Sequence, residues 1–276
     1  MISPECIASY RGAELSRGDT FLYIPPHALL RPYLSNYTIT FPTAQTMPDA
    51  YTILPTASST MTIAVGASGI MSGLRGVDTK ALQVGSFSNK LRLLLLIEFN
   101  PGGAHPFVPM DQLEWVDSSF ALSDLDRALK QAIETELMEC DSIEALVQAL
   151  DSLFLTRLMR RHTDTGVSAM LHHIARHHGS TSARELSGAF HYSEKHIRRL
   201  FLRHVGVSPK TYARIVRVNH ALRFLQDHPR SIADAAARAG FFDQPHMIHD
   251  LQTICGFTPQ AFLQNMSVFY NDRFKL

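Results

Sequence analysis

Cysteine is scarce in this sequence. The chain of 276 residues has three cysteines, Cys6, Cys140 and Cys255, and they lie far apart. An odd number at such wide spacing supplies neither a disulfide framework nor the close pairs of a structural zinc site. The cysteines therefore indicate a reducing compartment.

Long hydrophobic runs are also missing. The longest, at residues 93–97, is far shorter than the roughly 20 apolar residues that cross a bilayer. Residues 1–15 lack the basic start and the apolar core of a secretory signal. We therefore expect a cytoplasmic protein with no membrane partner.

Histidine is rare in the first half of the chain, where only His27 and His105 precede residue 160. That half also shows no paired carboxylates and no Ser/His/Asp set. Four later histidines close a predicted helix: His172, His173, His177 and His178. Positive charge is favourable at a helix C-terminus, and no cysteine or carboxylate joins these histidines as a further metal ligand. We expect no enzymatic activity, no metal and no cofactor.

Charge is distributed unevenly along the chain. Residues 1–159 hold 10 Lys and Arg against 17 Asp and Glu, whereas residues 160–230 hold 13 against 4. Residues 231–276 hold 3 against 4. A basic block of this size is typical of a domain that binds a polyanion, although a solvated basic surface gives the same count.

Residues 1–117 read as a β-rich domain. Runs rich in β-branched and aromatic residues lie at 21–24, 36–41, 51–54, 60–65, 81–84 and 91–99, between clusters of Pro, Gly, Ser and Asn. The last run is apolar on both faces, which favours a central strand. We expect a small barrel or sandwich. Aromatic residues that could line a ligand site in its mouth, or simply fill its core, are Tyr23, Tyr37, Phe41, Tyr51, Phe99 and Phe107.

Residues 118–159 change to a helical pattern. Ser123 is placed to cap a helix at 125–138, and Asp141 to cap a second helix with a wide apolar stripe. These two helices either close the β-rich domain or form the interface of a homodimer. We expect a homodimer, because paired DNA sites commonly match the two-fold symmetry of the protein. Residues 160–166 are polar, end in glycine and read as the linker.

The stretch from residue 183 to residue 259 contains one pattern twice, at an offset of 50 residues. The matched pairs are Ala183 with Ala233, Ala189 with Ala239, Tyr192 with Phe242, Ile197 with Met247, Phe201 with Leu251, Gly206 with Gly256, Ser208 with Thr258 and Pro209 with Pro259. An amphipathic segment at 211–226 separates the copies. Two copies are too few for a solenoid, so the repeat indicates one kind of surface used twice.

The first copy predicts a helix-turn-helix. Ser182 and Glu185 form a capping box that starts one helix, and Ser193 caps the next after a short turn. The residues expected to be buried are Ala183, Leu186 and Ala189 in the first helix, and Ile197, Leu200, Phe201 and Val205 in the second. The opposite face of the second helix carries Lys195, Arg198, Arg199 and Leu202. Lysine and arginine on such a helix can bond to guanine O6 and N7 in the major groove.

The second copy repeats this arrangement with fewer cations. Ser231 and Asp234 have the spacing of a capping box, and Asp243 is placed to cap the second recognition helix. The side chains expected to face the groove are Gln244, Pro245, His246 and His249. Arg238 is the only lysine or arginine in residues 231–262. A spacer helix of about 17 residues would be roughly 25 Å long, near the ~34 Å of one DNA turn, so both helices could enter successive major grooves.

These residues resemble the AraC/XylS family of bacterial transcription regulators over residues 167–264. The strongest markers are the run at residues 239–248, Ala-Gly-Phe-Phe-Asp-Gln-Pro-His-Met-Ile, and the later Gly256-Phe257-Thr258-Pro259. The other matching residues are Ser193, Ile197, Arg199, Leu200, Phe201, Gly206, Ser208 and Pro209 in the first copy, and Arg217, Ala221 and Leu225 in the spacer. The first half of the chain is similar to the variable sensing domain of that family.

The resemblance implies an α+β multidomain fold. It comprises a β-rich cupin-like barrel plus two helices in residues 1–159, a linker at 160–166, and in residues 167–276 an all-α domain of two helix-turn-helix subdomains joined by a long helix. The base contacts that it implies are Lys195, Arg198 and Arg199 in the first copy and Gln244, Pro245, His246 and His249 in the second. His249 stands where the family usually has arginine, and Leu202 and Gln252 where it often has lysine. We therefore expect weaker binding by the second copy.

The expected function is a sequence-specific DNA-binding transcriptional regulator that responds to a small molecule through its N-terminal domain. Double-stranded DNA and RNA polymerase are the implied partners. A DNA-binding module without effector, acting as a constitutive dimeric regulator, remains the alternative. A DNA-repair protein with a similar module would need a cysteine-rich zinc site, and a cupin enzyme would need more N-terminal histidines than this chain has.

Overall fold

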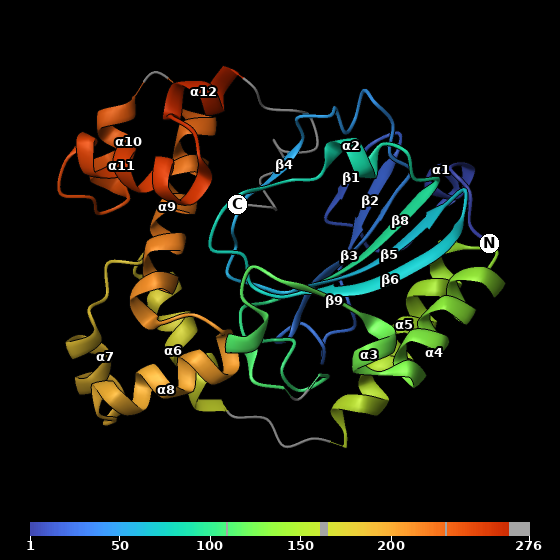
Figure 1. Ribbon diagram of the computed structural model, residues 1–276, viewed down its shortest axis with the longest axis horizontal. Helices are drawn as coiled ribbons and strands as arrows, with labels where there is room; N and C mark the ends of the chain where they lie inside the picture. Colours follow the sequence, from blue (N-terminus) through green and yellow to red (C-terminus); the bar gives the residue numbers. More distant parts are fainter. Residues whose placement is uncertain (109, 161–164, 230, 265–276) are drawn as a thin grey trace.

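The structure is a computed structural model of the 276-residue chain, and it describes residues 1–108, 110–160, 165–229 and 231–264. A β-rich part that ends in helices is followed by an all-helical part (Figure 1). The expected fold class is thereby confirmed. Within the described ranges no helix combines the length and the apolar character that a bilayer crossing requires.

The β-rich domain is built on one antiparallel sheet with the strand order β1-β2-β3-β8-β5-β6-β9. Its strands are β1 (Ser16–Arg17), β2 (Phe21–Ile24), β3 (Leu34–Thr40), β5 (Thr60–Gly66), β6 (Gly69–Arg75), β8 (Leu93–Phe99) and β9 (Ser119–Ala121). Ile97 of β8 lies opposite Tyr37 of β3 on one side and Met61 of β5 on the other. The prediction that this apolar segment is a central strand is confirmed.

Three strands of this sheet have no clear sequence pattern. β6 reads Gly-Ile-Met-Ser-Gly-Leu-Arg, without alternating β-branched residues, and its pairing along β5 follows from the turn that joins Gly66 to Gly69. β1 and β9 are short and lie at the two ends of the strand order. Two predicted segments form a separate ribbon instead, made of β4 (Thr52–Ile53) and β7 (Leu82–Gln83), with the short helix α2 (Gly85–Ser88) directly after it.

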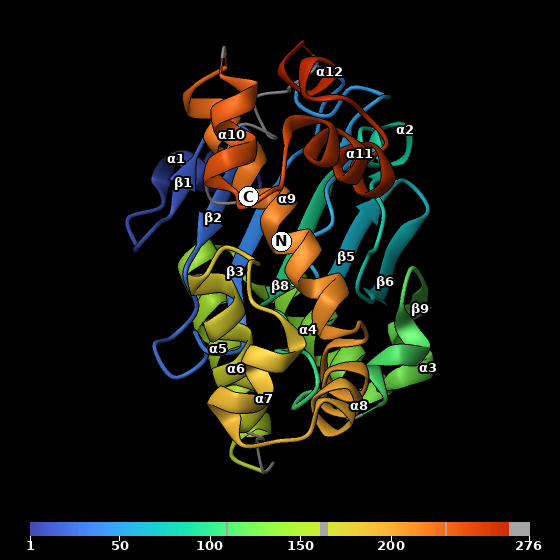
Figure 2. The ribbon, with the colours of Figure 1, turned by 90° about the vertical axis from the view of Figure 1, so that its left-hand side faces the viewer.

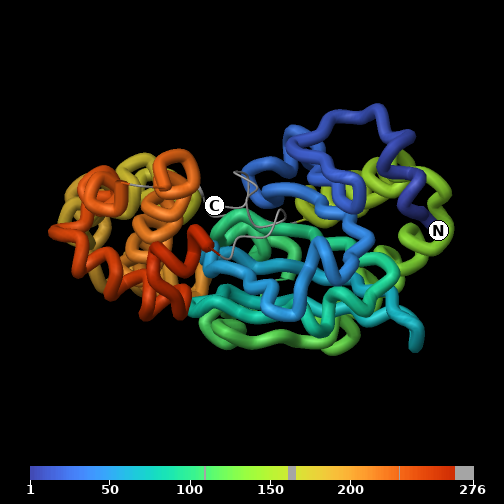
Figure 3. The backbone as a smooth tube through the Cα atoms, turned by 90° about the horizontal axis from the view of Figure 1, so that it is seen from above, coloured from blue at the N-terminus to red at the C-terminus, as the bar shows by residue number. Residues whose placement is uncertain are grey.

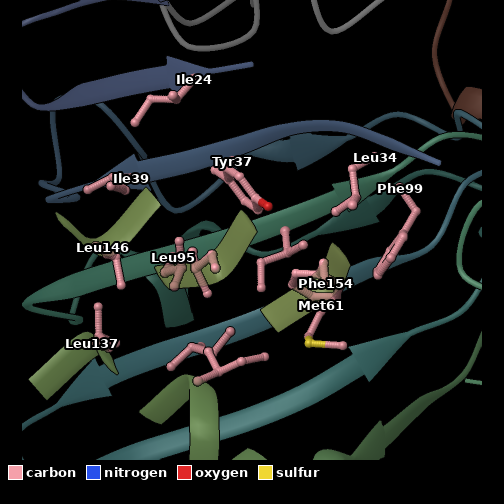
Figure 4. Packing of buried hydrophobic residues seen from close by; sticks show 14 of the residues in the cluster. Ile24, Leu34, Tyr37, Ile39, Met61, Leu95, Phe99, Leu137, Leu146 and Phe154 are labelled. Atoms are coloured by element: carbon pink, nitrogen blue, oxygen red, sulfur yellow. The ribbon is translucent and has the colours of Figure 1, made fainter. Parts of the chain in front are cut away.

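Helices α4 (Arg127–Glu139) and α5 (Ile143–Leu158) cover one face of the sheet, and residues of α1 (Glu5–Ser9) join the same core. Figure 4 shows how side chains of the strands and of the two helices interdigitate. The labelled core residues are Ile24, Leu34, Tyr37, Ile39, Met61, Leu95, Phe99, Leu137, Leu146 and Phe154. The apolar stripes that suggested a dimer interface therefore close the β-rich domain of the same chain, and the homodimer stays a prediction.

The starts of these two helices differ from the prediction. Asp126, and not Ser123, caps α4, because Ser123 belongs to a separate short helix, α3 (Leu122–Leu125). Ser142, and not Asp141, caps α5. Serine and aspartate cap equally well, so where two such residues lie close together the tertiary packing decides which one is used.

The opposite face of the sheet carries a smaller apolar cluster and a buried polar group. Asn36 Nδ2 donates to Thr38 Oγ1 at 2.7 Å, and Thr38 Oγ1 donates to Glu98 Oε1 at 2.6 Å. The six aromatic residues considered as a ligand lining are divided between the two faces. Tyr37, Phe41, Phe99 and Phe107 belong to the main core, and Tyr23 and Tyr51 belong to the smaller cluster.

The helical domain has two helix-turn-helix units at the two ends of one long helix (Figures 1 and 2). Its helices are α6 (Thr165–Arg176), α7 (Ala183–Phe190), α8 (Glu194–Val205), α9 (Pro209–Asp227), α10 (Ile232–Arg238), α11 (Gln244–Cys255) and α12 (Pro259–Gln264). α7 and α8 form the first unit, and α10 and α11 form the second. The sequence predicts the linker at residues 160–166, but α6 already begins at Thr165, and residues 161–164 lie outside the described residues.

Most of the predicted helix starts in this domain are confirmed. Ser182 and Glu185 form the capping box of α7. Ser231 does not cap α10, because its hydroxyl bonds to the Asp234 carboxylate and not to the backbone. The prediction that α7 buries two alanines is also wrong: Ala183 and Ala189 are exposed, and Leu186 alone is buried.

The β-rich domain contacts both helix-turn-helix units at equivalent places, the C-terminal ends of α8 and α11. Figure 3 shows the helical domain beside the β-rich domain. Gly206, which ends α8, lies against the carbonyl of Gln112 in the short helix η1 (Gln112–Trp115). In the second unit the Ile254 carbonyl accepts a 2.9 Å bond from the Ala81 amide. Three buried side chains of the β-rich domain also join the apolar clusters of the helical domain: Leu54, Ala57 and Val77. The partly buried Ala81 and Val116 pack against the same clusters.

Candidate nucleic-acid interface

The first recognition helix, α8, separates an apolar face from a basic one. Ser193 caps it by accepting a bond from the His196 amide, as predicted. Its buried residues are Ile197, Phe201 and Val205. Lys195, Arg198 and Arg199 are all exposed, and Arg199 Nη2 lies 3.0 Å from His196 Nδ1. The three cations thus lie in the first two turns, which is the part of a recognition helix that meets base edges.

The second recognition helix, α11, presents amide and imidazole groups instead of cations. Asp243 caps it, with Pro245 in its first turn, as predicted. Gln244, Pro245 and His249 are exposed. The side chain of His246 is only 40% exposed, since it is turned partly toward the body of the domain. All four predicted residues therefore lie at the protein surface within residues 244–249, but the side chain of His246 is less accessible to DNA than the other three.

The two recognition helices are separated by α9, whose length is fixed by hydrogen bonding along one continuous helix. At 19 residues, α9 is roughly 28 Å long. α8 and α11 lie at its opposite ends (Figure 2). The length of α9 is therefore close to the ~34 Å of one turn of B-DNA.

A family model described as a helix-turn-helix domain matches residues 186–265 of this chain. The match begins within α7 and includes α8, α9, α10 and α11. This region is an AraC-type helix-turn-helix domain.

Two curated relatives are similar to part of this chain. An uncharacterized HTH-type transcriptional regulator of Escherichia coli (strain K12), YidL, is 33% identical over 84 residues, which are 30% of this chain and 28% of the relative. A second one, YbfI of Bacillus subtilis (strain 168), is 28% identical over 119 residues, which are 43% of this chain and 42% of the relative. The chain therefore matches less than half of the length of either relative.

Solved structures of ToxT from Vibrio cholerae are similar over most of the chain. The O395 protein covers 89% of this chain and 96% of its own, with 10% identity and a TM-score of 0.40. ToxT bound to (E)-4-(8-methylnaphthalen-1-yl)but-3-enoic acid covers 77% and 93%, with 11% identity and a TM-score of 0.42.

The AraC-type domain contains one functional candidate that the sequence patterns missed. Asp250 of α11 is a buried carboxylate with 3% of its surface exposed, and it forms an ion pair with Arg214 of α9. Burial alone would raise the pKa of the Asp250 carboxyl, but the hydrogen bonds and charge of Arg214, with smaller contributions from His246 and Arg217, hold that pKa below its usual range. In the repeat, Asp250 of the second copy matches Leu200 of the first copy. A carboxylate at a position that is apolar in the other copy is the sequence feature that could have indicated this residue.

The turns of the two units share a second missed feature. Tyr192 and Phe242, which match in the repeat, directly precede the caps of α8 and α11. Tyr192 is 40% exposed and Phe242 is 92% exposed. Both turns of the AraC-type domain therefore carry an aromatic side chain at the surface beside the recognition helix.

Two of the four histidines at and just after the end of α6 place a ring nitrogen close to a backbone carbonyl of the preceding turn. His177 Nδ1 lies 2.7 Å from the His173 carbonyl, and His172 Nδ1 lies 2.9 Å from the Ser168 carbonyl. In the part of the chain that the structure describes, no three His, Cys, Asp or Glu side chains are grouped as metal ligands.

Proposed function

We propose that this protein is a sequence-specific DNA-binding transcriptional regulator that contacts double-stranded DNA with α8 and α11. The observation that carries the proposal is the placement of two recognition helices at equivalent positions of a repeat, at the two ends of one rigid helix. Their solvent-facing side chains, Lys195, Arg198 and Arg199 on α8 and Gln244, Pro245, His246 and His249 on α11, are the proposed DNA contacts.

The charge distribution supports a division of labour between the two units. Residues 160–230 contain 13 Lys and Arg against 4 Asp and Glu, and most of this excess lies at residues 165–227, from the start of α6 to the end of α9, which hold 10 against 3. Phosphate attraction therefore comes mainly from the first unit and the spacer helix. The second unit contributes hydrogen bonding to bases, for which a glutamine at the first position of α11 suits adenine.

Direct capture of DNA tests this proposal. Purified full-length protein is mixed with random duplex fragments, and the retained fragments are sequenced. The proposal predicts a shared motif with two half-sites about one helical turn apart, and affinity that falls steeply as salt is raised. Retention of fragments without any common motif would show a non-specific polyanion binder and would contradict the proposal.

We further propose that a small molecule binds at the junction of the two domains. A cavity of about 280 Å³ lies between the loop at residues 101–106 and helices α6 and α8. Its lining includes Tyr33, Gly102, His105, Leu171, Arg203 and His204. A ligand there would touch the β-rich domain and the first helix-turn-helix unit together, so its binding energy would bias how the two are held. The arginine and histidine side chains favour a ligand with an anionic or hydrogen-bond-accepting group.

A thermal-shift screen of the full-length protein separates this sensor from the effector-free alternative. A ligand at 100 times its Kd adds about 2.7 kcal/mol to folding stability and raises Tm by several degrees. The sensor proposal predicts such a shift for some small acids or polar metabolites and a smaller shift in Arg203→Ala. A library that leaves Tm unchanged would favour a constitutive regulator.

The remaining assignments are proposals that follow from this function. We propose residues 1–159 as the sensing domain, 160–166 as the linker and 167–276 as the DNA-binding domain. We also propose a homodimer and RNA polymerase as the partners through which operator binding changes transcription.

A further inference from the structure

Two arginines on one face of α9 hold the second helix-turn-helix unit. Arg214 and Arg217 are three residues apart, so their side chains lie on the same side of the helix. Arg214 Nη2 lies 2.8 Å from Asp250 Oδ1, and Arg214 Nε lies 3.3 Å from Asp250 Oδ2. The guanidinium carbon of Arg217 lies 5.0 Å from the ring centroid of Phe241, and its Nη1 donates to the Gly240 carbonyl at 3.5 Å. One arginine therefore contacts the recognition helix, and the other contacts the turn before it.

Among the residues that the structure describes, the first unit shows no counterpart of this ion pair. Leu200 occupies the place of Asp250 and packs against the apolar cluster of the first unit, where Phe201 lies 6.1 Å from the ring of Tyr212 on α9. Apolar packing of this kind has no preferred direction. A two-point bond between guanidinium and carboxylate, in contrast, fixes both the distance and the angle of the two groups. The second recognition helix is thus oriented on α9 by a directional contact that the first does not use.

Asp250 also lies beside the DNA-facing histidines of α11. His246 Nε2 lies 3.9 Å from Asp250 Oδ2, and its ring meets Phe241 edge-on at 5.3 Å. His249 Nδ1 lies 3.7 Å from Asp250 Oδ1. The Asp250 carboxylate therefore lies next to Arg214 of α9 and, at the same time, next to two DNA-facing side chains of α11.

We infer that Arg214 and Asp250 are positioning residues, which set the orientation of α11 on α9 and so place Gln244 and His246 against the second half-site. This inference rests on the proposed DNA-binding function. According to this inference, the ability of α11 to distinguish its half-site from other DNA sequences depends on Arg214 and Asp250, two residues that do not themselves face the groove. Asp250 is buried, and the Arg214 side chain is 31% exposed. An ion pair with a buried carboxylate gives little net stability compared with an apolar pair of similar volume, so the property that its replacement removes is the orientation of α11.

The first test is the double variant Arg214→Met with Asp250→Leu, which gives the second unit the leucine of the first. We expect Tm to stay within a few degrees of the wild-type value, because a well-packed apolar replacement of a buried ion pair is often neutral. Affinity for the full operator is expected to fall about tenfold, the value of one lost base contact. On DNA with a randomised second half-site, wild type and variant are expected to bind equally.

The second test is Arg214→Lys, which keeps the charge near Asp250 but removes the two-point geometry. We expect it to fold normally and to show a smaller loss that is again confined to the second half-site. Lys195→Ala serves as the matched control, since its loss should be confined to the first half-site. Unchanged discrimination in both variants, or equal losses at both half-sites, would overturn the inference. Failure of the wild-type protein to select any motif would instead defeat the proposed function, and the wild-type titration reveals this before any variant is made.

Discussion

At the scale of single residues, the two recognition helices differ in the kind of group they offer to DNA. The first two turns of α8 expose three permanent cations, Lys195, Arg198 and Arg199, whereas α11 presents an amide, a proline and imidazoles. Arg199 of α8 and His249 of α11 occupy equivalent positions of the repeat. Of the differences between the two helices, we expect this one to affect DNA binding most. An arginine can bond to guanine through two donors and also attracts phosphate, which a neutral imidazole does only weakly.

Arg199→Ala is therefore expected to weaken operator binding by ~1–3 kcal/mol, the value of a good base contact. His249→Ala is expected to weaken it less. Both are measured by gel-shift titration at one fixed salt concentration. Arg127→Ala, which removes an exposed positive charge from the β-rich domain, is the matched control and should bind as the wild type does. Equal affinity of Arg199→Ala and Arg127→Ala would remove Arg199 from the interface, and a larger loss at His249 would reverse the ranking.

His220 gives the helical domain a dependence on pH. Its ring stacks on that of His178, with centroids 3.8 Å apart and planes within 8°. Burial, and then the positive charges of His178 and Arg223, lower the pKa of His220. The unfolded chain therefore binds a proton at this site more readily than the folded chain does. Stability from this residue is fully present above a pH of about 6.5 and is lost as the pH falls below that value.

Urea unfolding at pH 7.5 and pH 5.5 measures this effect. The wild-type protein is expected to lose more free energy of unfolding between the two pH values than His220→Gln, which has no titrating ring at this site. The comparison between the two proteins cancels the acid sensitivity of the groups that do not contact His220. Identical losses in both would contradict the assignment.

At the scale of elements, the glycines that end α8 and α11 form a matched pair. Gly206 has φ 88° and Gly256 has φ 77°, in the left-handed region that favours glycine. A Cβ on Gly206 would lie 2.7 Å from the Gln112 carbonyl oxygen, whereas a Cβ on Gly256 would meet no atom within 4 Å. Alanine at position 256 therefore tests the backbone strain alone. Alanine at position 206 tests the backbone strain together with the contact between α8 and the β-rich domain.

Gly256→Ala is expected to cost about 1–2 kcal/mol of stability, the usual penalty of a left-handed non-glycine residue. Gly206→Ala is expected to cost more, because α8 must also move away from η1. Urea unfolding of both variants gives the comparison. An equal cost at both sites would show that the contact between α8 and η1 contributes nothing to the stability of the folded chain.

Features that depend on residues close together in the sequence could be predicted from it. Features that depend on contacts between distant segments of the chain could not. The capping box of Ser182 and Glu185 and the cap at Asp243 depend on residues three apart, and both are present. β6 depends on pairing with β5, and its own residues give no sign of it. The prediction that Ala183 and Ala189 are buried was wrong for a related reason, because α7 is short and only its Leu186 reaches the core.

The same distinction applies to the candidate site. The exposed cations of α8 follow from helical spacing around Ile197 and Phe201, so their placement could be predicted. The Arg214–Asp250 pair joins residues 36 positions apart, and only the folded domain shows that they meet. The exposure of the α8 cations could therefore be predicted from the sequence, whereas the contact between Arg214 and Asp250 could not.

At the scale of the whole molecule, the β-rich domain contacts both recognition helices at their C-terminal ends. The Ala81 amide bonds to Ile254 in the second unit, and η1 lies against Gly206 in the first. Asn219 of α9 also donates to the Pro55 carbonyl at 2.9 Å. Both helix-turn-helix units and the spacer helix are thus fixed to one body, so the separation of α8 and α11 is a property of the entire chain.

The most direct test of the account is the dependence of operator affinity on the spacing between the two half-sites. Insertion of 5 base pairs turns the second half-site to the opposite face of the duplex, because one turn of DNA is about 10 base pairs. We predict that this insertion lowers the affinity to that of a single half-site, and that a 10-base-pair insertion does not restore it, because α9 has a fixed length. Affinity that is unchanged by the 5-base-pair insertion would contradict simultaneous binding by two rigidly spaced helices.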